Sequence, residues 1–202
     1  LGSTHHSLHD YAVLRTINNI DIIAPADNFE TRKAVEASVN HPRPIYMRLG
    51  KRAIETVHAP DTRFDIGKAI VMKQGKDVTF VATGEPLIQV VQPVALLEQA
   101  GLSCGIISMH TIKPFDSEAL LHAAKNTRAL ITVEEHSIYG GLGERCASLL
   151  IEHGIYLPFK IVGFPDEHTV TGSQMEIFAH YGLAPEGLAA TARTLLHAEV
   201  TG

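Results

Sequence analysis

The sequence predicts an α/β protein whose mainly parallel sheet is covered by helices on both faces. Short apolar runs alternate with segments of helical periodicity along most of the 202 residues, and this alternation favours a parallel sheet. Apolar residues make up 45% of the chain, which is enough for one good core or two small ones. The composition is therefore that of an ordinary globular protein.

The first predicted elements are a helix and a strand. Tyr11, Leu14 and Ile17 lie at three-residue spacing and predict a helix over 9–18. The apolar run that follows predicts a strand over 20–23. The chain begins without a methionine, as though inside a loop, and we expect its N-terminus to be truncated.

A second helix and strand follow in the same order. Pro25 ends the first strand, and Asp27 with Glu30 three residues later forms an aspartate version of the capping box. The helix that begins there is expected to run to about residue 40, and the next strand is predicted over 45–49.

The hydrophobic periodicity fades over 50–64, where prolines and charged residues appear, and we place a boundary between two domains there. Two apolar runs after it, 69–72 and 78–82, flank a short polar segment and predict a hairpin. One strand of the second sheet is therefore expected to be antiparallel to its neighbour.

The rest of the chain repeats helix and strand more regularly. Pro93 lies inside the first of these helices and would cost about 3 kcal/mol in a continuous helix, so we expect a kink or a late start. Helices are predicted over 86–100, 117–126, 143–152, 173–181 and 185–196, and strands over 105–108, 129–133 and 159–162.

Charge and composition exclude several classes of function. The formal net charge is −5, and the nearest approach to a basic cluster is Arg48, Lys51 and Arg52, so no nucleic-acid partner is expected. No apolar run reaches about 18 residues, so no membrane span is expected. Cys104 and Cys146 lack the spacing of a metal or redox site and are expected to be buried thiols in a reducing cytoplasm.

Two places in the first fifty residues carry side chains suited to chemistry. His5 and His6 precede the first helix and lie off its apolar face; function, a solvated pair, and a metal site with His9 are the alternatives. Arg48 follows a strand, where open α/β sheets bind ligands, and a guanidinium can hold a phosphate through two parallel bonds. A surface ion pair is the alternative for Arg48.

A third candidate is the glycine-rich turn at 140–143, which joins a strand to a helix as in phosphate-binding turns. Its spacing is not that of dinucleotide-binding motifs, and the preceding Glu134 and Glu135 would repel a pyrophosphate. Tight turning with close backbone packing is the preferred interpretation.

Taken together, these motifs resemble transketolases, deoxyxylulose-phosphate synthase and the beta subunits of 2-oxoacid dehydrogenases. The resemblance is an ordered series of motifs over nearly the whole chain. The matching segments are 2–10, 24–27, 44–49, 83–84, 111–116, 133–136, 140–143 and 182–183, with the sequences GSTHHSLHD, APAD, PIYMRL, TG, TIKPFD, VEEH, GGLG and GL.

This resemblance implies the last part of a pyrimidine-binding α/β domain over 1–50, a linker over 51–64, and over 65–202 a three-layer α/β/α transketolase C-terminal domain with a mixed, mostly parallel sheet. In that family thiamine diphosphate and Mg²⁺ are held by an N-terminal domain that this sequence does not contain. No cofactor is therefore expected on this chain alone, which should be inactive without the missing region or partner subunit.

The resemblance also implies roles for two residues. His5 matches the histidine that hydrogen-bonds the donor substrate near its C1 hydroxyl, and Arg48 the arginine that binds the substrate phosphate. Leu1 stands where sugar-phosphate transketolases place an aspartate, which makes a keto-acid donor or an unusual sugar possible. The C-terminal domain implies no catalytic residues, only subunit contact and stability.

The leading hypothesis is a transketolase fragment that moves a two-carbon ketol unit from a ketose phosphate to an aldose phosphate in cytoplasmic carbohydrate metabolism. A homodimer is the oligomer that the resemblance implies. The alternatives are a beta subunit of a 2-oxoacid dehydrogenase complex and a non-catalytic dimerisation module.

Overall fold

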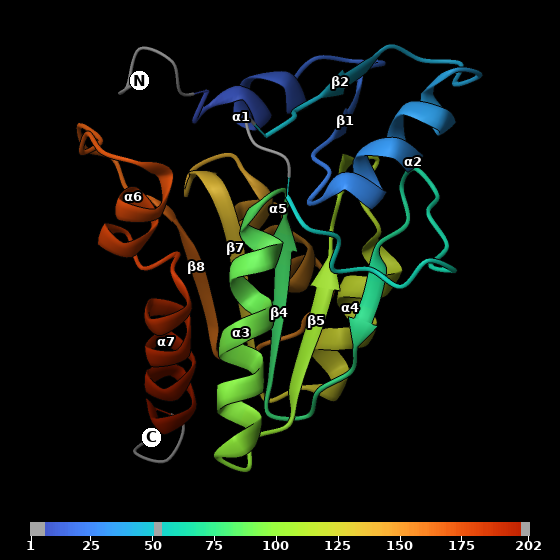
Figure 1. Ribbon diagram of the computed structural model, residues 1–202. Coiled ribbons are helices and arrows are strands. Elements are labelled where there is room, and N and C mark those ends of the chain that lie inside the picture. The colour runs from blue at the N-terminus through green and yellow to red at the C-terminus, as the bar shows by residue number, and fades with distance from the viewer. Residues whose placement is uncertain (1–6, 51–53, 199–202) are drawn as a thin grey trace.

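A computed structural model describes residues 7–50 and 54–198. The first segment lies over the carboxyl ends of the strands of a larger sheet, which helices cover on both faces (Figure 1). It contains α1 (Asp10–Arg15), β1 (Asp21–Ile23), α2 (Asn28–Ser38) and β2 (Ile45–Met47). None of the helices in the described part of the chain is long and apolar enough to cross a membrane.

The larger sheet has five strands in the order β3-β5-β4-β7-β8. All neighbours pair in parallel except β3, which is antiparallel to β5. The predicted α/β class with a mixed, mostly parallel sheet is therefore confirmed. The strands are β3 (Ile70–Lys73), β4 (Val78–Thr83), β5 (Cys104–Ser108), β7 (Ala129–Ser137) and β8 (Phe159–Phe164).

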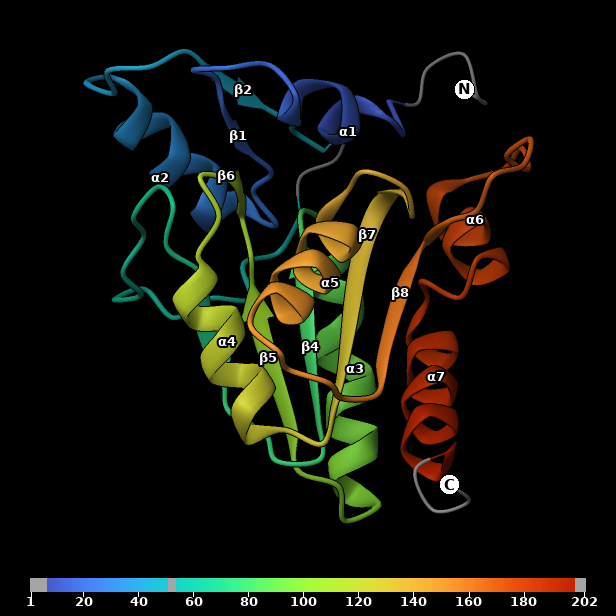
Figure 2. The same ribbon diagram turned by 180° about the vertical axis from the view of Figure 1, so that it is seen from behind.

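Helices cover the two faces of this sheet in separate groups (Figure 2). One face carries α3 (Pro86–Gln99) and α7 (Pro185–Ala198), which pack against each other, and the other carries α4 (Ser117–Asn126) and α5 (Leu142–Glu152). α6 (Gln174–His180) follows β8 and has a full capping box at Ser173. α3 is continuous from Pro86 through the buried Pro93, so there is no late start, and the alternative, a kink, stays a prediction.

Two apolar cores result, one on each face of the sheet. β4 is buried on both faces, so its side chains alternate between the two cores, and Thr79 and Thr83 are buried with them. Phe80 packs in the core beneath α3 and α7, and Val81 packs in the core beneath α4 and α5. Cys104 and Cys146 are buried free thiols, as predicted, and burial raises the pKa of both.

The predicted hairpin of β3 and β4 is wrong, because β5 lies between the two strands. The loop that joins them crosses the beginning of β5 at very close range. A Cβ atom at Gly75 would lie 2.0 Å from the backbone nitrogen of Gly105, so only glycine fits this crossing. A short polar segment between two strands is therefore compatible with a loop that steps over a third strand.

A three-residue strand that the sequence did not predict joins the two segments. β6 (Thr111–Lys113) pairs antiparallel with β1, and β1 pairs in parallel with β2, which gives a second sheet of order β2-β1-β6. The first segment and the larger sheet are thus connected by backbone hydrogen bonds as well as by packing. The predicted domain division at 51–64 stays a prediction.

A buried cluster of charged groups joins α2 to residues 54–64. Asp27 accepts a hydrogen bond from the Glu30 amide, as predicted, but the Glu30 side chain bonds the Ala26 amide rather than that of Asp27. His58 lies 2.9 Å from Asp27 Oδ2 and 3.1 Å from Glu30 Oε1. Glu30 also accepts a hydrogen bond from Ser108 of β5 at 2.5 Å. The cluster therefore ties three parts of the fold together.

We predict that the His58 charge stabilises the protein below about pH 9. Burial alone lowers the pKa of His58, but Asp27 and Glu30 outweigh it and raise the pKa to about 9. This stabilisation is fully present below the ordinary histidine pKa of about 6.5 and is lost as the pH rises towards 9; it amounts to about 3 kcal/mol. Urea unfolding of the chain and of His58→Gln at pH 6 and pH 9.5 measures it. Equal pH dependence of the two proteins would contradict the prediction.

Candidate functional site

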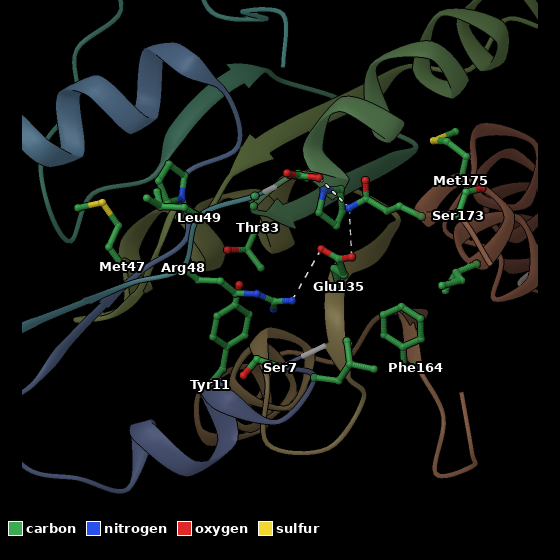
Figure 3. A pocket seen from close by; sticks show the side chains of 18 of the residues that line it. Ser7, Tyr11, Met47, Arg48, Leu49, Thr83, Glu135, Phe164, Ser173 and Met175 are labelled. Carbon is green, nitrogen blue, oxygen red and sulfur yellow. Dashed lines mark hydrogen bonds and ion pairs between the residues drawn. The ribbon is translucent and has the colours of Figure 1, made fainter. Parts of the chain in front are cut away.

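A cavity of about 730 Å³ lies where the first segment meets the carboxyl ends of β4 and β7 (Figure 3). Its wall combines charged, hydroxyl-bearing and apolar side chains from both segments. The lining residues are Ser7, Leu8, Tyr11, Pro25, Tyr46, Met47, Arg48, Leu49, Gly50, Thr83, Gly84, Glu85, Pro86, Glu135, Phe164, Gly172, Ser173, Gln174, Met175 and Ile177.

The connections of the larger sheet explain why the cavity forms at β4 and β7. The chain leaves β4 through α3 to reach β5 on one side, and it leaves β7 through α5 to reach β8 on the other. The two crossovers therefore diverge at this pair of strands. Open α/β sheets bind ligands at such a switch point, beyond the carboxyl ends of the strands.

Arg48 follows β2 directly, as predicted, and it lines the cavity. Its guanidinium lies 5.0 Å from the centre of the Tyr11 ring and 3.7 Å from both Asp10 Oδ1 and Glu135 Oε2. Burial alone lowers its pKa, but Tyr11, Asp10 and Glu135 outweigh it and raise the pKa. Arg48 is thus a mostly buried cation that contacts carboxylates of both segments, and both 3.7 Å separations leave hydrogen-bonding capacity unused.

A second network begins at Glu135, the carboxylate that lies 3.7 Å from Arg48. The Gln174 side-chain amide donates to Glu85 Oε2 at 2.7 Å and to Glu135 Oε1 at 3.1 Å. The amide thereby holds two carboxylates close together, although they would otherwise repel each other. Burial raises the pKa of Glu135, and Arg48 and Gln174 oppose this rise.

Three consecutive residues near the end of β7 make three different connections, and the strand runs past the predicted end at residue 133. Glu135 faces the cavity and Arg48, whereas Glu134 and His136 face the other way. His136 Nε2 accepts a hydrogen bond from the Ala12 amide of α1 at 3.3 Å, and the ring stacks on Tyr11. Burial lowers the pKa of His136 to about 4, so it is neutral at pH 7.

Glu134 explains the glycine-rich turn. Its two oxygens accept hydrogen bonds from the Leu142 and Gly143 amides at 2.7 and 2.8 Å, so the anion position at the start of α5 is already filled. A Cβ atom at Gly141 would lie 2.0 Å from Glu134 Oε2. Close backbone packing, the preferred interpretation of this turn, therefore holds, and no nucleotide phosphate fits there.

The structure describes one of the two predicted site residues: Arg48 lines the cavity, and its binding of a phosphate stays a prediction. His5 lies outside the described residues, as does His6, so the role of the pair stays a prediction. Within 7–50 and 54–198, no group of three or more His, Cys, Asp or Glu side chains could hold a metal ion. Sequence reasoning missed Tyr11, Glu85 and Gln174, because each gains its place in the cavity from packing between distant segments.

Two family models match the chain. The pyrimidine-binding domain of transketolase matches residues 1–56, and the transketolase C-terminal domain matches residues 67–188. The chain is 45% identical over 193 residues to an apulose-4-phosphate transketolase subunit of Phocaeicola vulgatus, covering 95% of this chain and 61% of that protein. It is 32% identical over 190 residues to a putative transketolase C-terminal section of Methanocaldococcus jannaschii, covering 93% and 59%. The chain therefore spans about three fifths of the length of these relatives.

One solved structure supports the same assignment, and a second shows the shared fold. A structure titled as a split-gene transketolase, inactive beta4 tetramer, superimposes with a TM-score of 0.87 at 34% identity, covering 96% of this chain and 63% of that one. A transketolase from Campylobacter jejuni shares the fold, with a TM-score of 0.75 at 18% identity, covering 96% and 29%. The matched domains, in this order and over nearly the whole length, show that the chain belongs to the transketolase family.

Proposed function

We propose that the chain is the C-terminal part or subunit of a thiamine-diphosphate-dependent transketolase. The reaction is transfer of a two-carbon ketol unit from a ketose phosphate to an aldose phosphate. The observation that carries this proposal is the likeness to the split-gene transketolase chain, which covers 96% of this chain. The relatives named as subunits of a transketolase favour it over a 2-oxoacid dehydrogenase subunit.

The cofactor is proposed to lie mainly on an N-terminal region or partner subunit outside the 202 residues of this sequence. The described residues offer no three-carboxylate or histidine group for Mg²⁺, and Glu134 already bonds the amides at the start of α5, which removes that position for a diphosphate. When bound, thiamine diphosphate supplies the electron sink for the transferred two-carbon unit. This chain would contribute the substrate side of the site.

The proposed substrate contacts come from the first segment. His5 is proposed to donate a hydrogen bond near the C1 hydroxyl of the donor, and Arg48 to bind the substrate phosphate. Arg48 lines the cavity and retains hydrogen-bonding capacity, which supports this role. We further propose the domain division at 51–64, a homodimer of the complete enzyme, and a cytoplasmic location.

Reconstitution tests the proposed function. The chain alone, and the chain with the N-terminal polypeptide, would each be given thiamine diphosphate, Mg²⁺, a ketose phosphate and an aldose phosphate. We expect ketol transfer only from the mixture, because the proposal places the diphosphate site on the N-terminal polypeptide. Activity from these 202 residues alone would contradict the proposal.

Two other outcomes would identify the alternative functions. Turnover of a 2-oxoacid with a lipoyl acceptor would identify a dehydrogenase subunit, and a stable but inactive assembly would identify a dimerisation module.

The phosphate contact predicts a selective defect in Arg48→Lys. Lysine keeps the charge but cannot form two parallel bonds to one phosphate, so we expect the KM of a phosphorylated sugar to rise about tenfold. The KM of the same sugar without its phosphate should stay within about twofold, as should both values for the exposed control Arg63→Lys. Equal effects of Arg48→Lys on the two sugars would rule out the phosphate contact.

A further inference from the structure

The carboxyl end of β4 carries polar groups that the described part of the fold leaves unsatisfied. Thr83 and Glu85 are 1% and 8% exposed, and both residues line the cavity. Within the described part of the chain, neither Thr83 Oγ1 nor Glu85 Oε1 has a hydrogen-bond partner. Buried polar groups are normally paired, and an unpaired one is costly unless a ligand or water supplies the partner.

We propose that Thr83, Glu85 and Glu135 form a subsite for the hydroxyl groups along the uncharged carbon chain of a single sugar, with Gln174 as the positioning residue. The inference rests on the proposed function, since it assigns the hydroxyl-bearing carbons of the substrate to the C-terminal sheet. It gives that sheet a direct part in substrate specificity, beyond subunit contact and stability.

The charges of the wall favour hydroxyls over an anion. Among the described residues that line the cavity, Glu85 and Glu135 face one cation, Arg48, so this side of the cavity repels a phosphate group. An ionised carboxylate accepts hydrogen bonds and cannot donate them, whereas a sugar hydroxyl can donate. Arg48, 3.7 Å from Glu135, offsets part of this negative charge, so a neutral ligand is compatible with the wall.

The remaining surfaces of the cavity also suit a sugar. Leu8, Phe164 and Met175 line it beside the carboxylates and offer apolar surface to the carbon-bound hydrogens of a sugar chain. The Gln174 amide, bonded to both glutamates, fixes their carboxylates before a ligand arrives. A volume of about 730 Å³ at a switch point is ordinary for a small-molecule site.

Binding of a neutral sugar to the chain itself tests the subsite without the cofactor. Saturation-transfer NMR would compare D-ribose, D-ribose 5-phosphate and inorganic phosphate on the wild-type chain, Thr83→Val and Glu135→Gln. Thr132→Val is the matched control, because Thr132 lies in the neighbouring β7 and is fully buried, and its Oγ1 also has no hydrogen-bond partner among the described residues, yet it does not line the cavity. Thermal unfolding would confirm that each variant is folded.

We expect wild type and Thr132→Val to bind ribose, and Thr83→Val and Glu135→Gln to bind it at least about fivefold more weakly. In the reconstituted enzyme, the two cavity variants should raise the KM for sugars with and without phosphate alike. Ribose binding that is absent, or unchanged in folded Thr83→Val, would overturn the subsite. Transfer activity without ribose binding would leave the proposed function intact, and ribose binding without transfer activity would leave the subsite intact and refute the function.

Discussion

The position of one guanidinium determines how the two segments of this protein form a common cavity. Arg48 belongs to the first segment, where it contacts Tyr11 and Asp10, and it reaches Glu135 on the larger sheet. Without that cation, Asp10 and Glu135 would be two largely buried carboxylates with no balancing charge, which is strongly unfavourable. Glu135 also accepts a hydrogen bond from Gln174, so Arg48 and Gln174 meet at the same carboxylate.

The sequence was informative where local patterns decide the structure. The cap at Asp27, the helix over 117–126 and the position of Arg48 after a strand were predicted because each depends on neighbouring residues. The place of β5 between β3 and β4 could not be predicted in this way, because it is set by pairing between strands that are distant in the sequence. Arg48 was considered either as a phosphate ligand or as one half of an ion pair, and the structure shows that the ion pairs exist and join distant segments.

The residues at 133–136 show why a motif can be recognised before its physical role is known. Their alternation on β7 directs Glu134 to the amides of α5, Glu135 to the cavity and His136 to α1. None of these partners lies within the motif itself, so spacing alone could not assign them. Three neighbouring side chains at the end of β7 thus contact α5, the cavity and the first segment. In this way the larger sheet contributes to a site that it forms with the first segment.

The most direct test is a double-mutant cycle between Arg48 and Glu135, with Arg48→Met, Glu135→Gln and the double variant compared by urea unfolding. If the guanidinium holds the two segments together through this carboxylate, the single changes should be non-additive, with a coupling free energy of about 1 kcal/mol or more. Effects that add to within about 0.3 kcal/mol would show that the two side chains do not depend on each other, and would contradict the account.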